Sequence, residues 1–152
     1  MLAVLGQEVV RVVLRGDENP GPINKCRSIE EKKKRSFYKA KNIPAYTPSA
    51  TFWTRDKDVP LEKKIKHYNA LMALDFDDVE DLEALKEELK TIPWVYYAGL
   101  SVSGTGIFAI VPLDTDDYRM HRVFFDALEA EMKERGYKVD PSCKDVTRMR
   151  FV

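Results

Sequence analysis

Residues 71–77, which read Leu-Met-Ala-Leu-Asp-Phe-Asp, say more about the fold than any other stretch. The apolar run is short and predicts a buried strand, in which alternate side chains point to opposite faces of the sheet. Leu74 and Phe76 would therefore pack on one face, beneath helices. Asp75 and Asp77 would lie on the other, open face, so we expect two carboxylates at the end of a buried strand.

The chain after this strand carries patterns for two helices and three further strands. Apolar residues at spacings of three and four predict the helices, and short β-rich runs bounded by turn residues predict the strands. Asp78 would cap the first helix, Pro93 would end it, and Gly136 would end the second. The expected elements are a helix over 79–92, strands over 94–100 and 107–111, a helix over 114–135 and a strand over 146–152.

This order predicts an α+β fold with an RRM-like or ferredoxin-like β-α-β-β-α-β core at about 70–152. Two helices would cover one face of a four-stranded antiparallel sheet. The length of 152 residues suits one domain, which we divide into a smaller N-terminal α/β module, 1–63, and the core, 64–152.

The N-terminal module has weaker signals. The sequence predicts a strand over 8–15, a helix over 28–41 that starts at a capping box of Ser28 and Glu31, and an extended stretch over 46–53.

The composition bounds the class of protein. The chain has 25 basic and 25 acidic residues, so a strongly basic, histone-like binder is excluded. Cys26 and Cys143 fit no metal-binding spacing and predict free thiols in a reducing compartment. No stretch reaches the ~20 apolar residues of a membrane span, and the N-terminus lacks a clean signal-peptide core, so we expect a cytoplasmic protein without a membrane partner. The chain stops inside a strand pattern, which suggests the N-terminal part of a longer protein.

Carboxylates are the first candidates for chemistry. Asp75 and Asp77, about 7 Å apart on one strand face, could share a divalent cation such as Mg²⁺. Asp140 precedes the last strand and could add a third ligand for two-metal phosphoryl transfer. The alternatives are that Asp77 and Asp78 only cap the next helix, and that Asp140 only forms an Asp-Pro turn.

Anion-binding groups are the second set. The turn Ser101 to Gly106 offers hydroxyl and backbone N–H donors to an anion, although a tight hairpin needs the same residues. Arg148 and Arg150 share one strand face and suit a triphosphate or a nucleic-acid backbone, or they simply neutralise the aspartates. A basic run with aromatic neighbours suits a phosphate backbone, or is a solvated helix face. That run is Lys32, Lys33, Lys34 and Arg35.

The order of these motifs resembles the VirE N-terminal domain family of bacterial mobile-element proteins. The stretches that carry the resemblance are Ile43-Pro44-Ala45, Ser49 to Phe52, Ala73 to Asp77, Ser101 to Gly106 and Asp140 to Val152. That family in turn resembles the archaeo-eukaryotic primase and primase-polymerase superfamily. The resemblance implies a role in mobile-element DNA replication and a helicase-type region further along the full protein.

The resemblance also implies roles for individual residues. It implies that Asp75, Asp77 and Asp140 are catalytic and hold Mg²⁺ or Mn²⁺. It implies a nucleotide site made by Ser101, Ser103, Gly104, Gly106, Phe108, Arg148 and Arg150. Phe108 stands where the superfamily has a histidine that contacts the nucleotide, and it could stack on a base instead.

The sequence therefore predicts a metal-dependent, nucleotidyltransferase-like domain that binds a nucleoside triphosphate and DNA. One alternative is a non-enzymatic nucleic-acid-binding module, because RNA-recognition domains share this topology. The other is a docking module, in which Asp75, Asp77, Arg148 and Arg150 form a salt-bridged sheet face.

Overall fold

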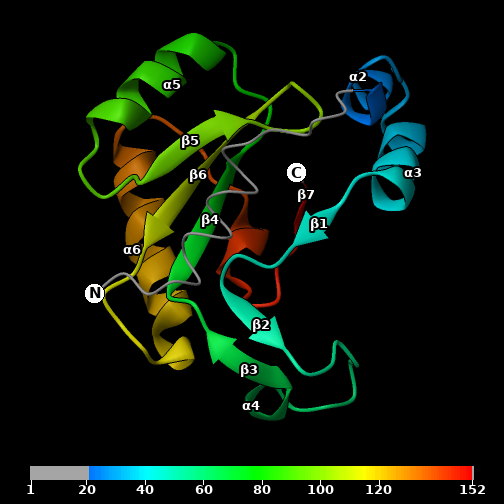
Figure 1. Ribbon diagram of the computed structural model, residues 1–152. Helices are drawn as coiled ribbons and strands as arrows, with labels where there is room; N and C mark the ends of the chain where they lie inside the picture. Colours follow the sequence, from blue (N-terminus) through cyan, green and yellow to red (C-terminus); the bar gives the residue numbers. More distant parts are fainter. Residues whose placement is uncertain (1–20, 152) are drawn as a thin grey trace.

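The computed structural model describes residues 21–151 and has the predicted α+β architecture (Figure 1). Its main sheet has three antiparallel strands in the order β4–β6–β5, which span Leu71–Phe76, Ile107–Pro112 and Tyr97–Leu100. The central strand β6 pairs with both neighbours, and Asp75 lies opposite Phe108 in the register.

Two helices cover one face of this sheet. Helices α5 (Leu82–Thr91) and α6 (His121–Glu134) pack on the core. The core cluster includes Met72, Leu74 and Phe76 from β4, Leu85 and Leu89 from α5, and Phe125 and Met132 from α6. The predicted alternation of β4 is therefore confirmed, since its even-numbered side chains all face the helices.

The other face of the sheet carries a second apolar cluster. Leu71, Ala73, Phe108 and Ile110 are buried there and Tyr97 packs beside them. Asp75 follows in the same alternation, so it lies at the end of this face. The sequence pattern placed this carboxylate correctly.

The last predicted strand is much shorter than expected and pairs elsewhere. Strand β7 (Arg150–Phe151) pairs with β1 (Ala45–Tyr46) and not with the main sheet. Within the described residues the four-stranded sheet is therefore wrong, although the predicted order of elements is present. The reason is that the chain before β7 is used in turns: Asp140 caps the short 3-10 helix η2 (Pro141–Lys144), and the Asp145 carboxylate accepts from the Thr147 N–H at 2.8 Å.

The remaining elements flank β1 and β7. Strands β2 (Ala50–Phe52) and β3 (Ile65–Tyr68) form an antiparallel pair, with the short helix α4 (Leu61–Lys64) before β3. The extended stretch expected at 46–53 is thus split between β1 and β2. Helices α2 (Gly21–Arg27) and α3 (Lys32–Asn42) precede them in the chain.

Several predicted helix starts were wrong because other residues provide the caps. The Ser28 hydroxyl donates to the Lys25 carbonyl and Glu31 makes no capping hydrogen bond, so α3 begins only at Lys32. Asp81, not Asp78, caps α5 by accepting from the Ala84 N–H at 2.9 Å.

Two other element boundaries differ from the prediction. Asp117 caps a short 3-10 turn, η1 (Tyr118–Met120), which replaces the start of the helix expected at 114–135. Strand β5 starts three residues later than expected. Both cysteines are free, as predicted, and the structure shows that both are buried. No helix within residues 21–151 is long and apolar enough to cross a membrane. The strand expected at 8–15 lies outside the described residues.

Candidate functional site

The end of β4 and the start of η2 bring two carboxylates together. The Asp140 N–H donates to the Asp75 carbonyl at 2.8 Å, which ties the two segments at their backbones. The Asp140 carboxylate accepts from the Ser142 N–H at 2.9 Å and from the Ser142 hydroxyl at 2.7 Å. Asp140 therefore forms the turn that the alternative interpretation expected, and it also lies beside Asp75.

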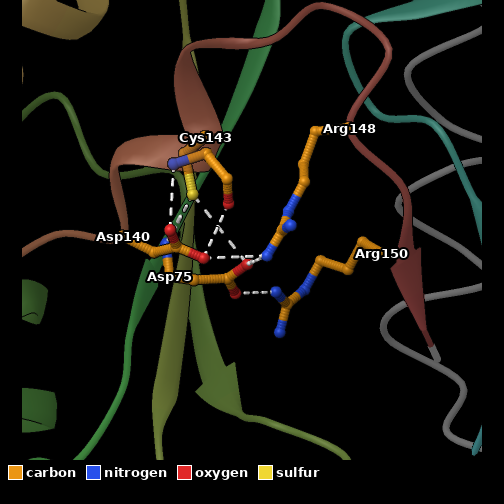
Figure 2. Close-up of polar contacts among 6 residues, drawn as sticks. Asp75, Asp140, Cys143, Arg148 and Arg150 are labelled. Carbon is orange, nitrogen blue, oxygen red and sulfur yellow. Dashed lines mark hydrogen bonds and ion pairs between the residues drawn. The ribbon is translucent and has the colours of Figure 1, made fainter. Parts of the chain in front are cut away.

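Two arginines from the segment ending in β7 face these carboxylates (Figure 2). Arg148 Nη2 lies 2.9 Å from Asp140 Oδ2 and 3.4 Å from Asp75 Oδ2, so one guanidinium bridges both acids. Arg150 pairs with the other oxygen of Asp75. The guanidinium of Arg150 also lies 3.5 Å from the ring centre of Phe108.

The two arginines differ in burial. The Arg150 side chain is 6% exposed, and the Arg148 side chain is 35% exposed. The Nε atoms of both are buried and have no hydrogen-bond partner within the described residues. Arg150 is thus enclosed within the site, while Arg148 is partly open to solvent.

The pKa directions describe a charged network. Burial raises the pKa of Asp140, but hydrogen bonds from Ser142 and the charge of Arg148 outweigh it, so the pKa is lowered overall. Burial lowers the pKa of Arg148, but Asp75 and Asp140 raise it by more. Burial lowers the pKa of Arg150, which as an arginine still keeps its proton.

Asp77 lies outside this network. It is exposed and makes no ion pair within residues 21–151. Partial burial raises its pKa, and the negative charges of Asp75 and Asp140 raise it further. The Asp77 carboxylate therefore lies near two negatively charged carboxylates, and within the described residues no cation pairs with it. The expectation that Asp77 caps the next helix is not met, because Asp81 does so.

Cys143 is a neighbour that sequence reasoning missed. Its sulfur accepts from the Asp75 N–H at 3.3 Å, and the ligand atoms of Asp75, Asp140 and Cys143 all lie within 4.8 Å of one another. Burial raises the pKa of this thiol to about 12, so it stays protonated. A protonated thiol is a poor ligand for a hard cation, and we assign Cys143 to the support of Asp75.

A cavity of about 320 Å³ opens beside the network. It brings together residues from five separate segments of the chain. The lining residues are Lys39, Arg55, Asp75, Asp77, Ser101, Val102, Ser103, Arg148, Met149, Arg150 and Phe151. Six of these were candidates from the sequence, whereas Lys39 and Arg55 were missed because they come from α3 and from the segment after β2.

A comparison with protein-family models matches residues 38–152 to the BT4734-like, N-terminal domain. The chain belongs to the BT4734-like N-terminal domain family. The match replaces the VirE N-terminal assignment, which was wrong, and it brings no link to primases. The motifs behind that assignment are short, and one Asp-x-Asp pair with a glycine-rich turn is not specific to one family. No curated protein and no solved structure matched the chain.

In this BT4734-like domain the whole cavity lies inside the matched range, since its first lining residue is Lys39. The docking alternative predicted that Asp75, Asp77, Arg148 and Arg150 form a salt-bridged sheet face. The ion pairs of Asp75, Arg148 and Arg150 are present, but Asp77 takes no part in them and a cavity opens beside them.

The glycine-rich turn of the BT4734-like domain contributes hydroxyls rather than glycines to the cavity. The hydroxyls of Ser101 and Ser103 lie 3.0 Å apart, and both residues line the cavity. The Gly104 N–H donates to the Ser101 carbonyl within the turn, so it is already used. A Cβ atom on Gly106 would lie 2.5 Å from the Phe76 carbonyl oxygen, so this glycine permits the close approach of β6 to β4.

Asp140 and two other sets of sequence candidates do not line the cavity. Phe108 is 6% exposed and covered by Arg150, so its ring is not open to a base. The basic run at the start of α3 does not line the cavity either, and Lys34 pairs with Glu31 at 2.8 Å. The members of that run are Lys32, Lys33, Lys34 and Arg35.

Proposed function

We propose that this domain binds a nucleoside triphosphate together with a divalent cation, Mg²⁺ or Mn²⁺, in the cavity beside Asp75. The observation that carries the proposal is the position of Arg148 Nη2. One positive group already lies between Asp75 Oδ2 and Asp140 Oδ2, at a point that borders a cavity with a third carboxylate, Asp77.

The residues present fit a hard cation. Carboxylate oxygens are the ligands that Mg²⁺ and Mn²⁺ prefer, and Mg²⁺ commonly uses one or two of them plus substrate phosphates. Asp75 and Asp140 have oxygens close enough to share one positive group. Burial raises the pKa of Asp77 most, and the charges of Asp75 and Asp140 raise it further; a cation near these three carboxylates would offset that repulsion. A bound cation would link these carboxylates to phosphate oxygens.

The rest of the lining favours phosphate. Four cationic side chains, Lys39, Arg55, Arg148 and Arg150, line the cavity against two carboxylates, so it attracts an anion. Arginine binds phosphate oxygens through two parallel donors, and the hydroxyls of Ser101 and Ser103 can add further hydrogen bonds. The cavity volume is at the lower end of the ~300–1,000 Å³ range for ligand sites, which suits a phosphate chain and its cation.

Arg148 would link the two binding events. In the structure it neutralises Asp75 and Asp140, and its exposure leaves it free to turn away. A cation that takes its place between the carboxylates releases its guanidinium toward the phosphates. Arg150 would stay with Asp75, because it is buried on Phe108.

The test is isothermal titration of Mn²⁺ with a nucleoside triphosphate into the wild type and Asp77→Asn. Asp77 is the informative position because its removal breaks no ion pair within the described residues. We expect binding that needs the metal, and a loss of about 10- to 100-fold in the variant, the size seen even for groups that only support metal ligands.

Asp78→Asn is the matched control. Asp78 is exposed, adjoins Asp77 and does not line the cavity, and its φ of +55° is one that asparagine adopts readily. The control should bind like the wild type. Nucleotide binding that ignores the metal, or equal losses in both variants, would refute the proposed site.

A further inference from the structure

The charges of the chain are divided between its two halves. Residues 21–68 contain 13 basic and 5 acidic side chains, whereas residues 69–151 contain 10 basic and 17 acidic ones. The first half holds α2, α3 and the β2–β3 pair, and the second holds the main sheet with α5 and α6. The net charge of zero thus conceals a strongly basic half.

Two large aromatic side chains stand out from this basic half, and each carries a cation. Trp53 is 70% exposed, and the Lys66 ammonium lies 4.6 Å from its ring centre. Phe37 is 69% exposed, with the Lys41 ammonium 5.7 Å from its ring centre. An exposed ring with a cation beside it offers a flat apolar face and a positive charge to the same partner.

Trp53 is held in place although its side chain is exposed. Its backbone N–H donates to the Lys64 carbonyl at 2.8 Å, which extends the pairing of β2 with β3 by one residue. A ring fixed at the end of a strand pair can stack on a flat partner at a lower entropic cost than a ring on a free loop.

Both aromatic residues lie close in sequence to cations that line the cavity. Lys39 follows Phe37 on α3, and Arg55 follows Trp53 after β2. Arg55 is anchored by a hydrogen bond from Nη2 to the Thr147 carbonyl at 3.1 Å. In Figure 1, strands β1 and β7 lie between α3 and the β2–β3 pair. Lys39 and Arg55 therefore line the cavity from two elements that also carry an exposed ring.

We infer that this surface binds single-stranded nucleic acid, with a base stacked on Trp53 and the phosphates along Lys66, Arg55 and Lys39. A flexible strand offers unstacked bases and a regular row of negative charges, which is the chemistry that an exposed ring among cations recognises. A duplex keeps its bases stacked on one another, so it could use only the charges. The inference needs no metal and does not depend on the proposed nucleotide site.

The test is fluorescence anisotropy of a labelled oligonucleotide of about 20 nucleotides, which is longer than the ~4–16 that one small domain covers. The titration uses the whole chain with a metal chelator present. Its result therefore does not depend on whether the proposed site binds a metal ion. Trp53→Ala should weaken binding by about 5- to 150-fold, the range for loss of one stacked base. Tyr96→Ala is the control, because Tyr96 is 56% exposed but lies in the acidic half.

Charge is tested separately. Lys66→Gln should reduce the slope of log affinity against log salt concentration by about 0.7, the value for one phosphate contact on a single strand. Lys90→Gln, an exposed position on α5, should leave the slope unchanged.

Oligonucleotides with deoxyribose and ribose distinguish DNA from RNA, and preferential binding of either single strand supports the inference. A duplex of the same length that binds as tightly would overturn it. Equal effects of Trp53→Ala and Tyr96→Ala, with both variants folded by circular dichroism, would overturn it too.

Discussion

Asp77 is the residue at which stability and binding should oppose each other. Its pKa is raised, first by partial burial and then by Asp75 and Asp140, so the folded protein disfavours its charge. Asp77→Asn should therefore raise the free energy of unfolding at neutral pH by about 0.5 kcal/mol, after allowance for solvent screening. The same change should weaken binding of the metal and nucleotide.

Urea unfolding at several pH values checks the sign. The gain should be present at neutral pH and vanish under acid conditions, where the wild-type Asp77 is protonated in both the folded and unfolded states. Asp126→Asn, an exposed position on α6 with no ion pair within residues 21–151, should show no such gain. A loss of stability in Asp77→Asn would contradict the account.

Arg150 and Arg148 should differ in their contribution to stability. Arg150→Met would leave the Asp75 charge partly buried without its fixed partner, and removal of one member of a buried pair costs about 3–5 kcal/mol. Arg148→Met removes a cation that is one-third exposed, and we expect a loss of about 1 kcal/mol. Urea unfolding of both variants measures the difference, and equal losses would show that Arg150 does not anchor the site.

Residue-scale prediction from the sequence succeeded where one strand determines the outcome. Alternation along β4 placed Asp75 on the face opposite the helices. Arg148 and Arg150 reach it from outside the main sheet, because β7 pairs with β1. Lys39, Arg55 and Cys143 could not be found in this way, because their place near Asp75 depends on how distant segments pack.

At the scale of elements, the approach of β6 to β4 depends on Gly106. A Cβ atom there would meet the Phe76 carbonyl oxygen at 2.5 Å, next to Asp77. Gly106→Ala should destabilise the fold by about 1–3 kcal/mol, as overpacking does, and should also weaken nucleotide binding because β4 must shift.

Gly136→Ala is the comparison for this effect. A Cβ atom on Gly136 meets nothing within 4 Å, but its φ of +88° strains any other residue. Thermal unfolding should show a loss of stability for both variants, with binding retained only in Gly136→Ala. Unchanged nucleotide binding in Gly106→Ala would show that the site does not depend on the close approach of β6 to β4.

The elements that the sequence predicted well are those with long, regular patterns. β4, β6 and the middle of α5 and α6 follow apolar spacing that local sequence determines. The last strand failed because Asp140 and Asp145 turn the chain before it, and its two remaining residues pair with β1 far away in sequence. Pairing between distant segments leaves no periodic signal.

At the scale of the whole molecule, His121 joins the β2–β3 pair to α6. Its Nδ1 lies 2.9 Å from the Tyr68 hydroxyl, and its Nε2 lies 3.5 Å from the Ser49 hydroxyl. Burial lowers the pKa of His121 to about 4, although Asp145 and a backbone hydrogen bond partly oppose this. The folded protein therefore holds His121 in its neutral form.

The stability of the whole domain should follow this titration. The unfolded chain takes up a proton on His121 near pH 6.5, so the free energy of unfolding should fall between about pH 6.5 and 4, by at most about 3 kcal/mol. His121→Gln should flatten this dependence, while His67→Gln, at an exposed position on β3, should retain it. Chemical unfolding across this pH range measures the free energy of unfolding of both variants. A steep pH dependence in His121→Gln would show that His121 is not the group responsible.

Sequence reasoning on the whole molecule identified the α+β class correctly and the family incorrectly. Fold class follows from the order of elements, which the chain shows over residues 71–151. Family assignment rested on short motifs, and the match of residues 38–152 to the BT4734-like N-terminal domain overturned it. The net charge of zero also concealed the basic half, which becomes evident once the elements are placed.

We expect a divalent cation to take the place of Arg148 between Asp75 and Asp140. Anomalous X-ray diffraction from crystals grown with Mn²⁺ and a nucleoside triphosphate would locate that cation. A manganese peak should lie within bonding distance of both carboxylates, with the Arg148 guanidinium turned toward phosphate. Crystals with nucleotide bound, no manganese at this position and Arg148 still bridging the two aspartates would contradict it.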